Sequence, residues 1–260
     1  IRGESRDGTI IESSSGRDST DSAIVLDGSY WTIENLTVRN ANVAILDNDD
    51  HVQRDGVVVR NCRIENCNHG IYLIRGSRTK TTVYNNLLID TRHDIYSGWG
   101  ASAPEGIIVS GQGIDIAYNT IYGWSDAISL FDTYTTMENE SPDFLALPNA
   151  GVHVYRNDIV YSQGSAIEMD GIERNGLVEE NRVSQGLWGV SLQTTGGGPV
   201  YVHRNVFYNI TSGGPIKDYV DPSGYHLWHN TSVCGRELYS GSFGSGSEGN
   251  NYDVYNNIFV

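Results

Sequence analysis

The sequence lacks the patterns that mark helices and membrane spans. No window repeats apolar residues at positions i, i+3, i+4 and i+7, and no apolar run approaches the roughly 20 residues that a membrane span needs. No N-terminal signal peptide is visible. Proline is scarce, with 6 residues, whereas 30 glycines and 16 tyrosines occur among the 260 residues. We therefore expect an all-β protein with few helices and no membrane span.

Positive charge is also scarce. Lys80 and Lys217 are the lysines of this chain, and its 32 acidic residues outnumber its 17 basic ones, which gives a formal net charge of −15. Such a charge repels the phosphate backbone of a nucleic acid, so we expect no nucleic-acid partner. A polyanionic substrate would need a metal ion or local basic side chains to offset the same repulsion.

Cysteine is too rare for a disulfide framework. Cys62, Cys67 and Cys234 are odd in number. Cys62 lies in an apolar, strand-like run, where a buried free thiol is expected. The short spacing between Cys62 and Cys67 leaves open a small disulfide loop in an oxidising compartment.

An internal repeat is the main feature that is present. An asparagine recurs just after a short β-type run, at an interval of about 25 residues with two enlarged intervals. These residues are Asn35, Asn61, Asn86, Asn119, Asn157, Asn181, Asn205, Asn230 and Asn257. A second apolar element, such as GIYLI, AISLF or AIEMD, follows roughly ten residues later, with a shorter apolar piece between the two. The unit therefore contains three short strands.

Short strands at a fixed period cannot each bury a face alone. Stacked units pair every strand in parallel with its neighbours, about 4.8 Å apart, around a continuous core. The recurring asparagine would bond to the backbone and the asparagine of the next coil, forming a ladder. We predict a single-stranded parallel β-helix, a solenoid of about nine coils, over residues 1–260 as one domain. Both ends read as mid-pattern, so we expect a mature chain or a fragment of a longer one.

These features resemble the right-handed parallel β-helix of the pectate-lyase-like superfamily. The resemblance covers residues 24–260 and rests on the three-strand coil, the ladder asparagine and the apolar pair in the next strand. It implies a right-handed solenoid, secreted or at the cell surface. It does not imply one activity, because the superfamily includes polysaccharide lyases, glycoside hydrolases, epimerases, phage tailspikes and adhesins. The motifs of polygalacturonases and alginate epimerases are absent, which disfavours those two groups.

Enzymes of this superfamily usually build their sites on the strand that follows the ladder and its short successor. Strand alternation predicts two outward rows on it. The first row is Leu46, Tyr72, Ile108, Ser129, Glu168, Ser191 and Lys217, and the second is Asn48, Ile74, Ser110, Phe131, Asp170, Gln193 and Tyr219. The two enlarged intervals add segments at 92–105 and 132–148 beside this face. We interpret them as walls of a cleft, and tolerated insertions are the alternative.

The candidate catalytic residues are Lys217, Glu168 and Asp170. The Cα atoms of Glu168 and Asp170 are expected roughly 6.5–7 Å apart on one strand, with Lys217 roughly 9–10 Å from Glu168 along the stack. We expect an extracellular polysaccharide or oligosaccharide as partner. The candidate substrate-binding residues are Gln193, Tyr219, Ser191, Phe131, Trp99 and His93.

Two chemistries suit these groups. In β-elimination, Ca²⁺ held by Glu168, Asp170 and Asp132 would neutralise a uronic acid carboxylate while Lys217 removes the C5 proton. This calcium-dependent lyase is the preferred hypothesis, and the resemblance allows it because lysine-plus-calcium lyases exist in the superfamily. In hydrolysis, Glu168 and Asp170 would be acid and base, with Asp126 and Asp132 in reserve.

Other interpretations stay open beside these two. A non-catalytic surface protein, adhesin or tailspike-like β-helix is one, and a merely solvated charged face is another. Histidines at zinc-ligand spacing are absent, so we expect no transition metal, and we expect no nucleotide cofactor. On the strand before the ladder, an outward row is expected to stack on sugar rings or on itself. Its members are Tyr155, Glu179, His203, Trp228 and Tyr255.

Overall fold

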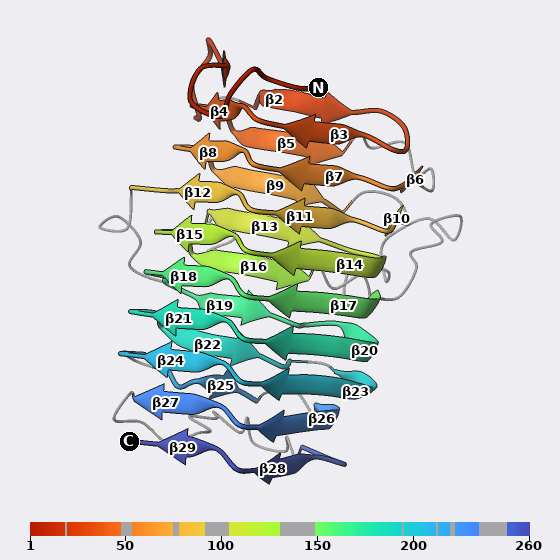
Figure 1. Ribbon diagram of the computed structural model, residues 1–260, viewed down its shortest axis with the longest axis vertical. Coiled ribbons are helices and arrows are strands. Elements are labelled where there is room, and N and C mark those ends of the chain that lie inside the picture. The colour runs from red at the N-terminus through yellow and green to blue at the C-terminus, as the bar shows by residue number, and fades with distance from the viewer. Residues whose placement is uncertain are drawn as a thin grey trace.

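The computed structural model describes residues 1–18, 20–47, 54–74, 78–91, 104–130, 149–193, 195–211, 213–218, 222–233 and 249–260. In this part of the chain all regular elements are strands, and no segment is helical. The chain is an all-β parallel solenoid, as predicted, with its coils stacked along one axis and its termini at opposite ends (Figure 1). The described residues include no helix with the length and hydrophobicity of a membrane span.

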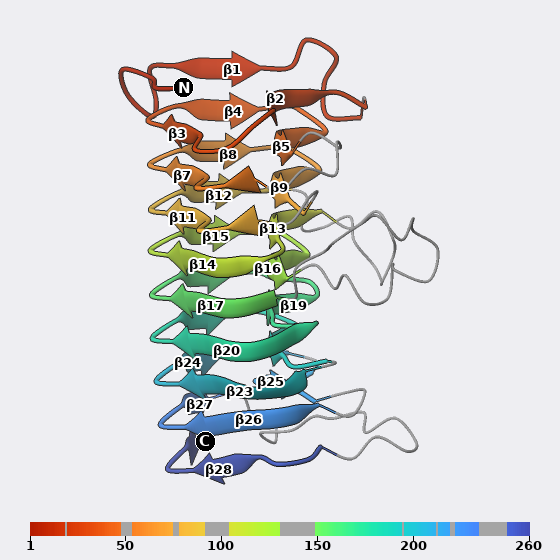
Figure 2. The same cartoon turned by 90° about the vertical axis from the view of Figure 1, so that its right-hand side faces the viewer.

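Three parallel sheets form the faces of the solenoid, which Figure 2 shows from the side. Sheet A contains β3 (Thr32–Glu34), β7 (Val58–Arg60), β11 (Thr82–Tyr84), β14 (Gln112–Ala117), β17 (Asn149–Tyr155), β20 (Ile172–Glu179), β23 (Gly196–His203), β26 (Ser223–Trp228) and β28 (Asp253–Tyr255), with the short β6 (Arg54–Asp55) and β10 (Arg78–Thr79). Sheet B contains β1 (Ile10–Glu12), β4 (Thr37–Arg39), β8 (Arg63–Glu65), β12 (Leu87–Ile89), β15 (Thr120–Tyr122), β18 (Asp158–Val160), β21 (Arg182–Ser184), β24 (Val206–Tyr208), β27 (Thr231–Val233) and β29 (Ile258–Phe259). Sheet C contains β2 (Ser22–Leu26), β5 (Val43–Asp47), β9 (His69–Leu73), β13 (Glu105–Val109), β16 (Asp126–Leu130), β19 (Ser165–Glu168), β22 (Trp188–Ser191) and β25 (Ile216–Lys217).

The number of coils differs slightly from the prediction. Seven coils have a described strand in all three sheets, from β3–β4–β5 to β23–β24–β25. The coils at the two ends contribute fewer described strands, and the predicted count of about nine included them. The fold class is unaffected, because the sheets continue through these incomplete coils.

The core is built from the inward row that the repeat predicted. Its members in sheet C are in register from coil to coil and none has exposed surface. They are Ile45, Ile71, Ile107, Ile128, Ile167, Val190 and Ile216. Complete burial of such a side chain contributes roughly 1.5–3 kcal/mol, so the row stabilises every coil.

The asparagine ladder is present in the later coils. Asn181 represents it: its Nδ2 donates to Val154 O at 2.9 Å and to Asn205 Oδ1 at 3.0 Å, while its Oδ1 accepts the Asn157 N–H at 3.0 Å. The same pattern connects Asn86, Asn119, Asn157, Asn181, Asn205, Asn230 and Asn257. The ladder thus pairs backbone groups that would otherwise be buried without partners.

The prediction was wrong for the first two ladder residues. Asn35 and Asn61 have positive φ angles of 59° and 54°, like Asn85 at 52°, and they lie one residue before the ladder position. That position is occupied by the buried Leu36 and Cys62. Asparagine is common in this left-handed conformation, so the turn before the ladder also selects it. The Asn85–Asn86 pair shows both uses side by side.

Cys62 substitutes for a ladder asparagine. Its N–H donates to Asn86 Oδ1 at 2.9 Å, and its Sγ lies 3.7 Å from Ile33 O, where the asparagine amide would donate. Cys62 and Cys67 are both buried free thiols, so the disulfide that the sequence left open is absent. Cys234 lies outside the described residues.

Replacing Cys62 by asparagine should extend the ladder by one coil. The new amide would donate to Ile33 O and accept the Leu36 N–H, which should raise the free energy of unfolding by about 1 kcal/mol, since a typical net hydrogen bond contributes about 0.5–1.5 kcal/mol. Urea denaturation of the two proteins measures the difference. The control Cys67→Asn places the same amide in a turn outside the ladder and should be destabilising. A Cys62→Asn protein that is less stable than the wild type contradicts the assignment.

Candidate functional site

The predicted outward row on sheet C is in register. Ser129 pairs with Glu168, Glu168 with Ser191, and Ser191 with Lys217. The row is not a solvated face: the exposed fractions of Ser129, Ser191 and Lys217 are 2%, 0% and 8%. Charged groups are rarely buried unless they are paired or functional. The simple alternative of a charged surface therefore does not describe this row.

Glu168 and Asp170 do not share one strand, although the sequence predicted that they would. Glu168 is the last residue of β19, whereas Asp170 lies in the turn after it, so the two are not on one strand. Asp170 Oδ1 accepts the Ser191 hydroxyl at 2.7 Å and the Gln193 N–H at 3.0 Å, both from the next coil. Glu168 Oε2 accepts the Ser129 hydroxyl at 3.2 Å from the previous coil. The two carboxyls therefore lean in opposite directions along the solenoid axis.

Two further carboxyls approach Glu168 from earlier coils. Asp126 begins β16 and is in register with Glu105, which begins β13. Asp126 Oδ1 accepts the Ser165 N–H at 2.6 Å, and Glu105 Oε2 lies 3.4 Å from His69 Nδ1. The sequence placed Asp126 in reserve and missed Glu105, although both precede the apolar element that repeats in each coil. We call Glu105, Asp126, Glu168, Asp170 and Lys217 the carboxyl cluster.

Gly164 makes the space for Asp126. A Cβ atom at this glycine would lie 2.2 Å from Asp126 Oδ1 and 3.1 Å from Oδ2. Any larger residue would displace the carboxyl from its place beside Ser165. The position before Ser165 is therefore a glycine for a steric reason: a larger side chain would collide with Asp126.

Burial holds protons on this cluster. It raises the pKa of Asp170 to about 8, and the Glu168 carboxylate adds to the effect. Burial, with the same Glu168 carboxylate, raises the pKa of Asp126 well above its ordinary value. Burial also raises the pKa of Glu168, but Lys217 opposes this. The Glu168 carboxylate opposes the ionisation of Asp126 and Asp170, so Glu168 ionises before these two, which keep their protons longer.

The cluster should make the protein less stable as the pH rises. Because the pKa of Asp170 is raised from 3.8 to about 8, the folded protein binds more protons than the unfolded chain between these values. The stability that this protonation contributes is complete below about pH 4 and is lost as the pH rises through about 8. Asp170→Asn keeps the acceptor oxygen without the titration. At pH 8 it should be about 1–3 kcal/mol more stable than the wild type, which raises Tm by about 2–4 °C per kcal/mol.

Thermal unfolding of both proteins from pH 4 to pH 8 measures this difference. The control Asp158→Asn removes a half-exposed carboxyl that pairs with Arg182 outside the cluster and should leave the slope of Tm against pH unchanged in this range. An Asp170→Asn slope equal to that of the wild type would contradict the burial of a protonated Asp170.

Several predicted site residues lie outside the described residues. These are Tyr219, Phe131, Asp132, Trp99 and His93, together with most of the segment 92–105 and all of 132–148. Gln193 is described and half-buried, and it contacts Asp170 through its backbone N–H rather than its side chain. The roles of these residues remain predictions.

The predicted aromatic row on sheet A is also in register, from Tyr155 through Glu179, His203 and Trp228 to Tyr255. The Trp228 ring stacks on His203 at 5.5 Å and 22°, and on Tyr255 at 5.4 Å and 21°. Both faces of the indole are thus covered by neighbouring rings. Self-stacking accounts for the row, because a sugar ring would need one of these faces.

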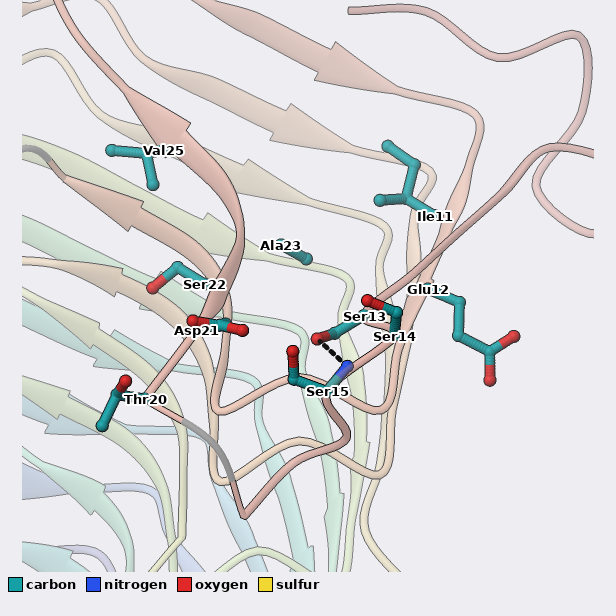
Figure 3. A pocket seen from close by; sticks show the side chains of 10 residues that line it. All are labelled: Ile11, Glu12, Ser13, Ser14, Ser15, Thr20, Asp21, Ser22, Ala23 and Val25. Carbon is teal, nitrogen blue, oxygen red and sulfur yellow. Dashed lines mark hydrogen bonds between the residues drawn. The ribbon is translucent and has the colours of Figure 1, made fainter.

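A hollow at the N-terminal end of the solenoid is rich in hydroxyl groups (Figure 3). Ser13, Ser14, Ser15 and Ser22 line it together with Asp21, from the segments around β1 and β2. Ser13 Oγ accepts the Ser15 N–H at 3.3 Å within the segment that follows β1. It is several coils away from Glu168 and is not part of the carboxyl cluster.

One comparison with known proteins gives a match. The family model described as NosD, periplasmic copper-binding protein, matches residues 2–103. No curated protein and no solved structure matches the chain. The matched part ends before Glu105, the first residue of the carboxyl cluster, so it includes no member of that cluster. The description of the family as periplasmic agrees with the expected secreted or cell-surface location.

This match corrects the expected cofactors. Calcium, with no transition metal, was expected, whereas the matching family is described as copper-binding. The residues described here nevertheless do not fit copper: none of their His, Cys, Asp and Glu side chains form a group of three or more that could hold a metal ion. Copper prefers thiolate, thioether and imidazole ligands. Burial raises the pKa of Cys62 and Cys67 to about 11, so these thiols stay protonated at neutral pH and are poor ligands.

Proposed function

We propose that the protein hydrolyses glycosidic bonds of an extracellular polysaccharide at the carboxyl cluster. One observation carries the proposal: the half-buried Glu168 lies near two carboxyls that keep their protons longer than it does, with Lys217 in the same row. Hydrolysis of a glycoside needs this combination, a protonated carboxyl for the leaving oxygen and an ionised one for the attacking water.

The roles follow from the order of ionisation. The protonated carboxyl gives its proton to the glycosidic oxygen while the bond from that oxygen to the anomeric carbon breaks. Glu168, ionised beside Lys217, takes a proton from the water that adds to the same carbon. One water is consumed, two hydroxyl-bearing products form, and the proton on Glu168 returns to the acid through solvent.

The charge of the cluster supports hydrolysis over elimination. Elimination acts on a uronate chain, whose carboxylates must be neutralised before the C5 proton can be removed. Lys217 is the one basic residue of the carboxyl cluster, and the whole chain has a net charge of −15, so a polyanion is repelled. The calcium ion that elimination required is no longer expected, and we do not retain the calcium-dependent lyase.

A panel of neutral, anionic and cationic polysaccharides tests the proposal. We expect new reducing ends from a neutral chain, without the ultraviolet absorbance of the unsaturated products that elimination forms. Added chelator should leave the rate unchanged. Absorbing products would support a lyase, and binding of a polysaccharide without cleavage would support a non-catalytic surface protein.

A further inference from the structure

The acid that partners Glu168 is not fixed by the proposed function, because two protonated carboxyls lie near it. The sequence predicts Asp170, two residues further along the chain. The structure adds Asp126, which lies 39 residues before Ser165, its contact in the next coil. The hydrogen bonds of these carboxyls differ in direction.

Asp170 is held away from Glu168. Its Oδ1 accepts two hydrogen bonds from the following coil, one from the Ser191 hydroxyl and one from the Gln193 N–H. These bonds resemble those of the ladder asparagines, since a side-chain oxygen accepts the N–H of a neighbouring coil. Asp170 therefore has a structural contact that accounts for its position.

Glu168 and Asp126 each bond to the other's strand. The Ser129 hydroxyl, which Glu168 Oε2 accepts at 3.2 Å, belongs to β16, the strand that Asp126 begins. Asp126 in turn is fixed to β19, the strand of Glu168, by the Ser165 N–H at 2.6 Å. Each carboxyl is thus anchored to the strand of the other. Gly164 keeps the space beside the Asp126 carboxyl free of a side chain.

Ser165 links the two carboxyls. Its N–H donates to Asp126 Oδ1 at 2.6 Å. Its fully buried hydroxyl faces the Glu168 carboxyl and lowers the pKa of that group. Glu168 and Asp126 therefore meet at one residue of β19, whereas Asp170 is bonded to the next coil.

We infer that Asp126, and not Asp170, is the second catalytic carboxyl, the acid that protonates the glycosidic oxygen while Glu168 activates the water. This inference rests on the proposed hydrolysis. The pair spans two adjacent coils, so the scissile bond lies between β16 and β19. Asp170 is then a positioning residue that fixes the turn after Glu168.

Other charged groups face the pair and act on its titration. Glu105 approaches from β13 and opposes ionisation of both carboxyls, and Lys217 from β25 favours it. Asp170 approaches from the turn after β19, and its pKa responds to Glu168. His69 of β9 contacts Glu105, and β22 contributes the uncharged Ser191 to the same row.

Initial rates of reducing-end release by Asp126→Asn and Asp170→Asn test the assignment. Asp126→Asn keeps the acceptor oxygen for the Ser165 N–H but removes the proton that the acid gives. We expect Asp126→Asn to lose about 10²–10⁴-fold in rate, and Asp170→Asn to keep the wild-type rate within about tenfold. The reverse result, with Asp170→Asn impaired and Asp126→Asn active, overturns the inference while leaving the hydrolase intact.

A titration that needs no activity separates this inference from the proposed function. Carboxyl carbons are followed by ¹³C NMR from pH 3 to pH 10 in the wild type and in Glu168→Gln, with Asp126→Asn and Asp170→Asn to assign the signals. If Asp126 is paired with Glu168, Glu168→Gln should lower the apparent pKa of Asp126 by at least about one unit. The fall in the pKa of Asp170 should be smaller. A larger fall for Asp170 overturns the pairing, whether or not any polysaccharide is hydrolysed.

Discussion

Glu168→Gln should reduce the rate of polysaccharide hydrolysis by about 10²–10⁴-fold, because the variant retains the shape of the side chain but cannot accept a proton from water. Glutamine can still accept the Ser129 hydroxyl, so the side chain should keep its direction toward β16. Because the pKa of Glu168 is raised in the folded protein, its charge lowers stability at neutral pH, and the variant should be at least as stable as the wild type there. Reducing-end assays at saturating polysaccharide, together with thermal unfolding, measure both effects.

The matched control is Glu180→Gln. Glu180 is in a turn next to sheet A, where its carboxylate accepts the Arg156 guanidinium at 2.6 Å, far from the carboxyl cluster. The Glu180→Gln protein should hydrolyse the polysaccharide at the wild-type rate. A Glu168→Gln protein that keeps the wild-type rate would remove Glu168 from the chemistry and, with it, the proposed function.

Asn181→Ala should lower the free energy of unfolding by about 3–5 kcal/mol, the range in which buried polar networks are broken. The alanine leaves the Asn157 N–H and the Val154 carbonyl buried, at the positions where Asn181 Oδ1 and Nδ2 now bond to them. Each unpaired group costs about 1–3 kcal/mol. The neighbouring Asn205 also loses one donor to its Oδ1.

Urea denaturation monitored by far-ultraviolet circular dichroism measures this loss. Asn209→Gly is the control, because Asn209 is an exposed turn residue with a φ of 53°, which glycine adopts freely. It should change the free energy of unfolding by less than about 1 kcal/mol. A loss at Asn181 no larger than at Asn209 would mean that the ladder contributes little to stability.

Much of the fold could be predicted because a solenoid repeats one local pattern. The period of about 25 residues, the three strands and the inward row from Ile45 to Ile216 all depend on side-chain alternation, which has a period of two in any strand. The outward row could be aligned for the same reason, and the pairing of Ser129, Glu168, Ser191 and Lys217 follows it. The ladder was misassigned at Asn35 and Asn61, where the turn residue is an asparagine but the ladder position is occupied by Leu36 and Cys62.

The candidate site was less predictable. Asp170 was expected on the strand of Glu168, but the strand ends at Glu168 and the turn directs Asp170 to the next coil. The alternation of apolar and polar residues could not show this, because the end of the strand depends on the hydrogen bonds between the turn and the next coil. Nor could it show that Ser191 and Lys217 are buried although they point outward.

The sequence by itself determined that this chain is a stack of parallel coils with Glu168 and Lys217 on one outward row. Each repeat contains its own alternation of apolar residues, so this could be recognised without knowing the contacts between repeats. The tertiary structure alone decided which carboxyls meet. Asp126 and Ser165 are 39 residues apart, across an enlarged repeat, and only the register of β16 on β19 brings them into contact. Burial then sets which of these groups keeps its proton, because the cost of a charge depends on what surrounds it in three dimensions.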